Sequence, residues 1–377
     1  MMPARPRTWW LILDRLVVVA FIAGLLVPAT FLVAGLRPPR LENRPLLEMP
    51  AVALVGLLDS SWARGVDAYL TDNGWLRRAA VPLRGELHWL TGGTGNLQVV
   101  RGRDDWLFIR DEFQPHCLVT AADLAAGFHD VASGFAAAGQ EFRFVLAPDK
   151  HTVYPDKVRR DFVFEPSCSE TGRAALQAGM AAQGTTAVDA GPFLDAVRRA
   201  RPRANLFYPQ DSHWTPEGAL VAIRALIDSM APGLWRDDEI VAAGTRRRRT
   251  DLARLIGLGH VEEATNFLVR PGITLQMEDV ALPSAATAAR TIFRVSASGS
   301  SPTIAGRTIV IYDSFFGIYV PLVAPFFADT TWVHVGDMLN HPELATNLGP
   351  FDRIVFERVE RGLYGTDVRT LLEPLIR

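Results

Sequence analysis

Asp211, His213 and Ser314 are the residues of this chain whose types could together perform covalent catalysis. A serine hydroxyl is a weak nucleophile at neutral pH, so it needs an imidazole to take its proton and a carboxylate to hold that imidazole in the correct tautomer. The acid and the base stand two positions apart, and the serine follows much later in the chain. The sequence therefore predicts Ser314 as a nucleophile, His213 as its general base and Asp211 as the group that orients the base.

Two regular elements have to position these side chains. Residues 307–312 are apolar and rich in β-branched side chains, which is typical of a buried parallel strand, and Ser314 follows its carboxyl end. Open α/β sheets place their sites at that edge. Thr215 and Pro216 are typical of a helix start, and apolar residues continue at helical spacing to Met230. We therefore expect the acid and the base in a short connection that leads into an amphipathic helix.

Other roles for the same residues are open alternatives. Asp-Ser pairs are common in turns and at helix starts, and an Asp-x-His sequence often makes only local hydrogen bonds. A metal-dependent hydrolase would use Asp211, His213, Asp149 and Asp313 as ligands. The chain has no His-x-x-x-His motif and no close carboxylate cluster to favour that reading, and we expect no metal.

Six short sequence blocks occur in a fixed order along the chain. They are residues 42–44, 102–108, 147–150 with 153–155, 211–218, 251–253, and 355–357 with 360–361. Together they resemble the SGNH-hydrolase-like alginate O-acetyltransferase family. The block that holds Asp211 and His213 precedes the serine, an order that resembles this family and reverses that of ordinary SGNH hydrolases.

The resemblance implies a bacterial periplasmic enzyme with an α/β, SGNH-hydrolase-like three-layer fold around a parallel central sheet. Such an enzyme moves an acetyl group, through an acetyl-serine and without a cofactor, onto hydroxyls of an exported polysaccharide such as alginate. The implied partners are that polysaccharide and a membrane-bound protein that supplies the acetyl group. A carbohydrate acetylesterase with the same three residues and a non-catalytic polysaccharide-binding or secretion scaffold are the alternative functions.

Four further residues are expected at the substrate site. The resemblance implies that Lys150 and Tyr154 contact the acetyl donor or a sugar, although a lysine after a strand is more often a solvated surface charge. Trp214 and Tyr312 flank the base and the serine and are assigned to the same site. The family usually has glycine at the position of Tyr312, so we expect a reshaped or narrower oxyanion site.

Residues 16–36 carry no charge, and a helix of this length would be about 32 Å long, enough to cross a hydrocarbon core of about 30 Å. We expect a transmembrane signal anchor, and a cleaved signal peptide is the alternative. The resemblance places residues 1–15 in the cytoplasm, the span in the inner membrane and the rest in the periplasm. Residues 37–100 are then expected to form a linker and a helical segment, and residues 101–377 the catalytic domain.

The net charge of −2 gives no overall field that would favour nucleic acid as a partner. Arg246 to Arg249 form a run of four basic residues. Such a run is either a solvated loop or a contact for a polyanion, for which a uronic-acid polymer would fit better than nucleic acid.

The two cysteines, Cys117 and Cys168, have no metal-ligand spacing. In an oxidising periplasm they could pair, and closing that loop would stabilise the fold by about 4 kcal/mol in the chain-entropy model. In a cytosolic chain they would be buried thiols.

Overall fold

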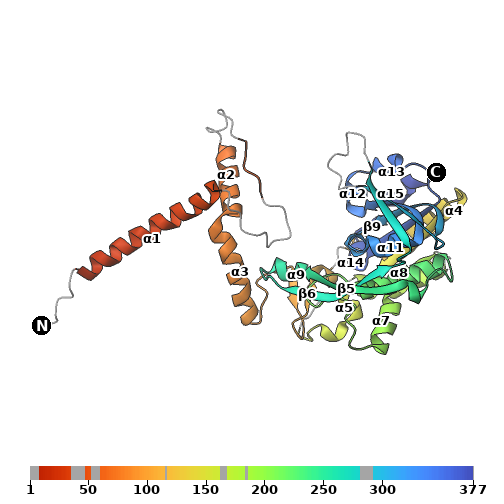
Figure 1. Cartoon of the computed structure of the whole chain (residues 1–377), viewed down its shortest axis with the longest axis horizontal. Helices are drawn as coiled ribbons and strands as arrows, with labels where there is room; N and C mark the ends of the chain where they lie inside the picture. Colours follow the sequence, from red (N-terminus) through yellow and green to blue (C-terminus); the bar gives the residue numbers. More distant parts are fainter. Residues whose placement is uncertain are drawn as a thin grey trace. The chain divides into compact units, whose positions relative to one another are not determined.

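The computed structural model describes residues 8–34, 47–51, 60–114, 117–161, 168–182, 186–280 and 292–376. The chain divides into two compact units (Figure 1). One unit comprises residues 1–96 and 253–259, and the other comprises residues 97–252 and 260–377. The second unit holds every residue predicted to take part in catalysis.

The first unit contains the helices α1 (Thr8–Val33), α2 (Ser60–Asn73) and α3 (Trp75–Leu90). Gly74 separates α2 from α3 with an extended backbone (φ −61°, ψ 134°). No helix in the described part of the chain is both long enough and apolar enough to cross a membrane. The transmembrane anchor expected at residues 16–36 therefore stays a prediction.

A seven-stranded sheet with the order β4-β3-β11-β9-β10-β8-β7 forms the centre of the second unit. Neighbouring strands from β4 to β10 are parallel, whereas β8 is antiparallel to both β10 and β7. The strands are β3 (Glu141–Ala147), β4 (Ala187–Asp189), β7 (Ile273–Asp279), β8 (Phe293–Gly299), β9 (Ile304–Tyr312), β10 (Phe327–His334) and β11 (Arg353–Val359). The predicted parallel sheet is therefore confirmed for its central part, and the complete sheet is mixed. Strand β7 is largely exposed and β8 is partly exposed, and both lack the continuous apolar run that marks a buried strand.

Helices cover both faces of this sheet (Figure 1). Successive side chains of a strand point to opposite faces, so Val310 belongs to one hydrophobic core and its neighbour Ile309 to the other. The first core includes residues of α7 (Ala190–Ala200) and α8 (Pro216–Met230). The second includes residues of α4 (Ala121–Ala137), α6 (Cys168–Ala182) and α15 (Val368–Leu372). This layering agrees with the expected three-layer α/β fold.

Short elements follow the ends of the long ones. Two small antiparallel pairs are formed by β1 (Val99–Arg101) with β2 (Leu107–Ile109), and by β5 (Ile240–Arg249) with β6 (Val261–Val269). The short helices are α5 (Lys150–Val153), α9 (Asp251–Leu255), α10 (Ser314–Gly317), α11 (Val320–Val323), α12 (Val335–Asn340), α13 (Leu344–Asn347) and α14 (Glu360–Leu363). Helices α5, α10 and α14 begin just after β3, β9 and β11, so they gather at the carboxyl edge of the parallel strands.

The helix expected to follow the Asp-x-His segment is confirmed as α8. Thr215 is its N-cap, with its side-chain oxygen accepting a hydrogen bond from the Gly218 backbone N–H (3.3 Å). A Cβ added at Gly218 would lie 2.1 Å from the carbonyl oxygen of Leu206 and 3.0 Å from Cβ of Trp214. The connection that carries the acid and the base therefore packs directly against the first turn of α8.

Replacing Gly218 with alanine has two opposing effects on stability, one from helix propensity and one from packing. Alanine favours a helix over glycine by about 1 kcal/mol, but overpacking against backbone costs about 1–3 kcal/mol. We expect Gly218→Ala to lower the free energy of unfolding by about 1 kcal/mol or more, measured by urea denaturation, because the Leu206 oxygen cannot move without moving the connection. Gly272→Ala is the control, since its Cβ would meet only ordinary contacts at 3.9 Å. Native stability of Gly218→Ala would contradict this tight packing.

Candidate active site

Ser314 begins α10 directly after β9, and its side chain is exposed. The residue before it, Asp313, is buried and holds the turn. One of its carboxylate oxygens accepts a hydrogen bond from the Phe315 backbone N–H (2.9 Å), and the other accepts one from the Val359 N–H (2.8 Å). The second bond ties the end of β9 to the end of β11. The serine therefore stands at the carboxyl edge of the sheet on a turn fixed by a buried carboxylate.

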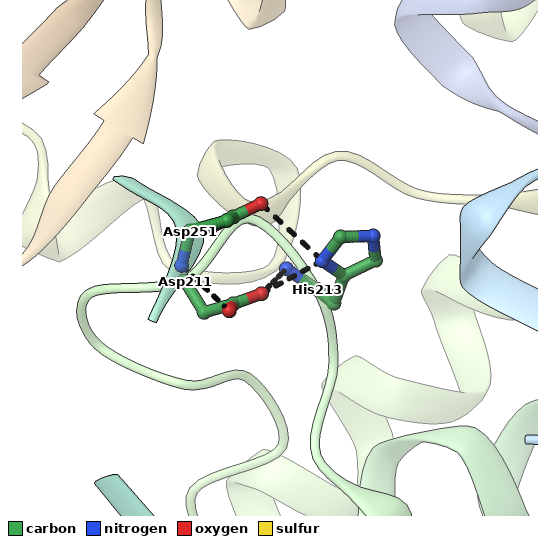
Figure 2. A group of neighbouring side chains, drawn as sticks. All are labelled: Asp211, His213 and Asp251. Atoms are coloured by element: carbon green, nitrogen blue, oxygen red, sulfur yellow. Dashed lines mark hydrogen bonds and ion pairs between the residues drawn. The ribbon is translucent and has the colours of Figure 1, made fainter. Parts of the chain in front are cut away.

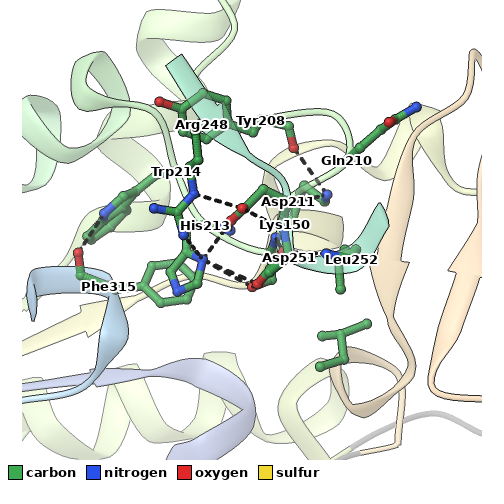
Figure 3. A network of polar contacts seen from close by, with 12 residues as sticks. Lys150, Tyr208, Gln210, Asp211, His213, Trp214, Arg248, Asp251, Leu252 and Phe315 are labelled. Atoms are coloured by element: carbon green, nitrogen blue, oxygen red, sulfur yellow. Dashed lines mark hydrogen bonds and ion pairs between the residues drawn. The ribbon is translucent and has the colours of Figure 1, made fainter. Parts of the chain in front are cut away.

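His213 and Asp211 lie in the connection before α8 and are both buried. His213 Nδ1 lies 2.7 Å from Asp211 Oδ1, which also accepts the His213 backbone N–H (3.1 Å). Asp211 Oδ2 accepts hydrogen bonds from Arg248 Nε (2.7 Å) and the Asp251 backbone N–H (2.9 Å) (Figure 3). Burial raises the pKa of Asp211, but the His213 hydrogen bond and the Arg248 charge outweigh it and hold the pKa well below its usual range. An ionised carboxylate in this position can hold the imidazole with its proton on Nδ1.

The imidazole of His213 lies against the turn that carries the serine. Its ring centroid is 5.1 Å from that of Phe315, and Trp214 Nε1 donates a hydrogen bond to the Phe315 carbonyl (3.0 Å). His213 Nε2 is buried and has no hydrogen-bond partner among the described residues, Ser314 included. The structure thus brings the acid, the base and the serine-bearing turn together, and the bond between serine and histidine stays a prediction.

Lys150 is buried beneath this connection instead of lying on the surface. Its Nζ donates to three backbone carbonyls, those of Tyr208 (3.3 Å), Pro209 (3.1 Å) and Asp211 (2.7 Å). It also lies 5.1 Å from the centroid of the Phe108 ring. An ammonium group has three donors, and all three are used here. We therefore assign Lys150 to the support of the connection, and its expected contact with an acetyl donor or a sugar stays a prediction.

Tyr154, Trp214 and Tyr312 are also buried. The Tyr154 O–H donates to the Ala204 carbonyl (3.1 Å), and the Trp214 N–H is engaged with the serine turn. The ring of Tyr312 packs edge-to-face on Trp332, with 5.5 Å between centroids. These side chains shape the frame of the site, and a direct contact of any of them with substrate stays a prediction.

Ser212, Arg248 and Asp251 complete the polar network, although the sequence alone suggested no catalytic role for them. Asp251 Oδ1 accepts the Ser212 backbone N–H (2.7 Å), and its Oδ2 accepts the Ser212 hydroxyl. Asp251 Oδ2 also lies 3.5 Å from His213 Nδ1. A signal was present for two of them, because Asp251 opens one of the sequence blocks and Arg248 belongs to the basic run.

The basic run lies on strand β5, so its interpretation as a solvated loop is wrong. Its side chains alternate as in any strand, with Arg247 and Arg249 exposed and Arg246 and Arg248 partly buried. Polar composition alone suggested a loop, whereas pairing with β6 decides the strand. A polyanion contact through this run stays a prediction.

Asp211, His213 and Asp251 also place one possible metal-ligand atom each within 4.8 Å of one another (Figure 2). The oxygens of both carboxylates are already occupied by hydrogen-bond donors. A bound cation would also lie beside the guanidinium of Arg248, whose charge would repel it. These residues fit a hydrogen-bonded catalytic pair better than a metal centre.

The other two carboxylates of the metal-hydrolase alternative are engaged elsewhere. Asp149 forms an ion pair with Arg361, and Asp313 accepts the backbone N–H groups of Phe315 and Val359. Burial raises the pKa of Asp149 to about 7 against the opposing charge of Arg361. The four ligands of that alternative therefore do not act as one cluster in the described part of the chain.

Cys117 is disulfide-bonded. The side chain of Cys168, the only other cysteine, lies outside the described residues. The predicted pairing of these two cysteines therefore stays a prediction.

Residues 99–281 match the family described as the SGNH hydrolase-like domain of the acetyltransferase AlgX. The matched range includes Asp211 and His213 and ends before Ser314. The resemblance predicted from the sequence blocks is confirmed, since residues 99–281 are similar to an SGNH-like acetyltransferase domain.

Named relatives agree with this match over part of their length. A probable alginate O-acetylase AlgJ of Pseudomonas syringae is 24% identical over 177 residues, which cover 45% of this chain and 43% of that protein. The corresponding protein of Pseudomonas fluorescens is 26% identical over 180 residues, which cover 46% of this chain and 44% of that protein. The chain thus matches less than half the length of these curated relatives.

Two solved structures are similar to this chain. Bacillus cereus PatB1 superposes with a TM-score of 0.51 at 15% identity, covering 72% of this chain and 98% of that chain. The O-acetyltransferase domain of Pseudomonas putida AlgJ gives a TM-score of 0.47 at 18% identity and covers 71% of this chain and 92% of that chain. The first of these superpositions supports the fold alone.

The substitution Lys150→Met tests whether Lys150 stabilises the connection that leads into α8. Methionine is of similar length but removes all three hydrogen bonds of the ammonium group. The carbonyls of Tyr208 and Pro209 keep the backbone N–H groups of Asp211 and Leu107, whereas the Asp211 carbonyl loses its described donor. We expect the free energy of unfolding to fall by about 3 kcal/mol in urea denaturation.

Lys157 provides the matched control, because this partly exposed lysine is paired with the exposed Asp104 and its replacement by methionine should cost less than about 1 kcal/mol. Equal losses in the two variants would contradict the assigned role of Lys150.

Glu262 on β6 gives a pH-dependent prediction. Its two carboxylate oxygens both lie 3.2 Å from the Gln210 backbone nitrogen, and burial raises the pKa of Glu262 to about 7. The folded state then binds more protons than the unfolded state between about pH 4.5 and pH 7, so stability falls as pH rises through this window. We expect Glu262→Gln to be more stable than the native protein by about 1–2 kcal/mol at pH 8 and nearly equal at pH 4, measured by urea denaturation.

The exposed neighbour Glu263, which pairs with Arg247, is the control for this measurement. Glu263→Gln should leave the pH dependence of stability unchanged. If Glu262→Gln kept the native pH dependence of the free energy of unfolding, ionisation of Glu262 would not destabilise the folded state.

Proposed function

We propose that this chain is an O-acetyltransferase that forms an acetyl-serine on Ser314 and passes the acetyl group to hydroxyls of an exported polysaccharide, alginate or another exopolysaccharide. The observation that supports this most is the buried pair of His213 and Asp211 packed against the serine-bearing turn. The imidazole nitrogen that would take the serine proton, Nε2, has no other partner in the described residues. The match to an O-acetyltransferase-like domain supports the reaction class.

The first half of the proposed reaction loads the enzyme. His213 Nε2 takes the proton of the Ser314 hydroxyl while Oγ attacks the acetyl carbonyl carbon of the donor. The donor leaves with the proton returned by His213, and the acetyl group stays on Oγ. Asp211 holds the Nδ1 proton throughout and stabilises the imidazolium that forms. Backbone N–H groups near Ser314 are the proposed donors to the oxyanion.

The second half transfers the acetyl group to its acceptor. His213 takes the proton of a sugar hydroxyl, whose oxygen attacks the acetyl carbon, and Ser314 Oγ leaves and regains the proton. If water takes the place of the sugar, the same steps release acetate, and the protein is an acetylesterase. The two activities therefore differ only in which hydroxyl reaches the acetyl-serine.

The proposed setting is the bacterial inner membrane, with the catalytic domain in the periplasm. The uncharged stretch at residues 16–36 supports a single-pass anchor. Acetyl groups made in the cytoplasm would then need a membrane-bound partner to carry them across. The sequence resemblance supports such a partner.

Hydrolysis of 4-nitrophenyl acetate by the purified full-length chain tests the nucleophile. We expect Ser314→Ala to reduce turnover by at least about 10³-fold, because the remaining groups cannot form the acetyl-enzyme. Mass spectrometry of the native protein should find the acetyl group on Ser314. Ser229→Ala is the matched control, since Ser229 lies on α8 and donates to the Leu226 carbonyl.

The product formed when an oligosaccharide acceptor is added to the same assay distinguishes the alternative functions. Acetylated oligosaccharide in preference to free acetate supports a transferase, and acetate alone supports an esterase. Native turnover in Ser314→Ala would overturn the serine mechanism. A folded native protein without turnover or adduct would favour the non-catalytic scaffold.

A further inference from the structure

Arg248 stands out because it is the member of the basic run that reaches the catalytic pair (Figure 3). On the same strand, the side chain of Arg247 is 72% exposed and pairs with Glu263, whereas that of Arg248 is 18% exposed and pairs with Asp211. Pairing of β5 with β6 fixes this alternation. The hairpin therefore turns one positive charge toward the site and the next toward solvent.

The two oxygens of the Asp211 carboxylate accept hydrogen bonds from different parts of the site. Oδ1 accepts both His213 donors, Nδ1 (2.7 Å) and the backbone N–H (3.1 Å). Oδ2 accepts Arg248 Nε (2.7 Å) and the Asp251 N–H (2.9 Å). A carboxylate held at both oxygens cannot rotate about its Cβ–Cγ bond without losing charge-assisted hydrogen bonds.

Other charged groups also face this pair from every element packed on it. They are Asp251 at the start of α9, Lys150 on α5, Glu262 on β6, and Arg361 on α14, whose guanidinium lies 5.5 Å from the centroid of the Phe315 ring. Of the cations, Arg248 is the one that donates to the Asp211 carboxylate, while Lys150 donates to backbone carbonyls. The guanidinium also comes within 3.3 Å of His213 Nδ1.

We propose that Arg248 is a positioning residue of this site, which holds the Asp211 carboxylate in place and in its ionised form and thereby fixes the orientation and tautomer of His213. This inference rests on the proposed function for its kinetic consequences but not for its structural ones. Arg248 acts through Asp211 and is not required to touch a substrate. The planar guanidinium is suited to this task because its donors are fixed relative to one another.

The direction of the pH effect follows from the charges. The positive charge of Arg248 is one of the causes that hold the pKa of Asp211 below its usual range, so its removal raises that pKa. The hydrogen-bonded pair of Asp211 and His213 then takes up a proton at a higher pH as the solution is acidified, because the lost positive charge lay beside both side chains. Activity on the acid side should therefore fall at a higher pH in a variant that lacks the charge.

Kinetics of 4-nitrophenyl acetate hydrolysis by the full-length chain test this. We expect Arg248→Gln to lower kcat by about 10- to 100-fold with KM changed less than about twofold, the size of effect typical of groups that orient a reacting residue. The pH of half-maximal activity on the acid side should rise by about one unit. Arg248→Lys should restore that pH but only part of kcat, because an ammonium restores the charge without the fork geometry.

Arg247→Gln is the matched control, since it removes the same charge from the next position of the same strand and should leave kcat and the pH profile native. Native kcat and a native pH profile in Arg248→Gln would overturn the proposal. Equal effects of the two substitutions would overturn it as well, because they would report a general charge effect.

A second readout does not depend on the proposed function. In ¹⁵N-histidine NMR spectra, with the His213 signals assigned from His213→Gln, we expect the native protein to show the Nδ1-protonated tautomer and Arg248→Gln to show a mixture of tautomers. If the native protein has no acetyl-ester activity, the proposed function fails, and this spectrum alone decides the role of Arg248. An unchanged tautomer in Arg248→Gln would overturn it.

If Arg248→Gln does not fold, Arg248→Lys carries the test. Reduced kcat with unchanged KM in this variant supports the proposal, and native kcat overturns the claim that the guanidinium geometry holds the carboxylate. In the absence of any native activity, the tautomer of His213 in Arg248→Lys serves instead, with an unchanged spectrum counting against the proposal.

Discussion

The buried carboxylate of Asp211 is the group on which the arrangement of the site depends. It accepts hydrogen bonds from the backbone and ring of His213, from Arg248 on β5 and from the backbone of Asp251 at the start of α9. A buried charge without such partners costs several kcal/mol, so the chain segments that supply the donors are held together by the need to satisfy it. The orientation of the imidazole follows from this requirement.

At the carboxyl edge of the sheet, buried side chains also fix the backbone, here around the proposed nucleophile. The order β3-β11-β9 brings the carboxyl ends of three parallel strands side by side. Asp313 accepts the backbone N–H groups of Phe315 in α10 and of Val359 at the end of β11, and this turn presents Ser314 to solvent. Lys150, from the end of β3, uses its three donors to fix the connection that carries the base. Buried charges thus hold the backbone on both sides of the proposed nucleophile.

Local sequence patterns predicted much of the frame but not the surroundings of its charged residues. The strand before Ser314 and the helix after Thr215 were predictable because apolar spacing and capping residues report directly on local structure. Strands β7 and β8 were not predicted, because neither the exposed edge strand β7 nor the partly exposed strand β8 has a continuous apolar run. Lys150 resembled a surface lysine because burial depends on which segment folds over it.

The sequence by itself determined the types of the proposed catalytic residues, the elements that carry them and the resemblance to an O-acetyltransferase-like domain, since all three depend on short stretches of the chain. Only the tertiary structure decided that Arg248 and Asp251 share the carboxylate with His213, that the basic run is a strand with alternating faces, and that Lys150 is buried. The physical reason is that these features arise where segments far apart in the chain pack together. A hydrogen bond between such segments depends on the register and packing of whole elements, which no local pattern encodes.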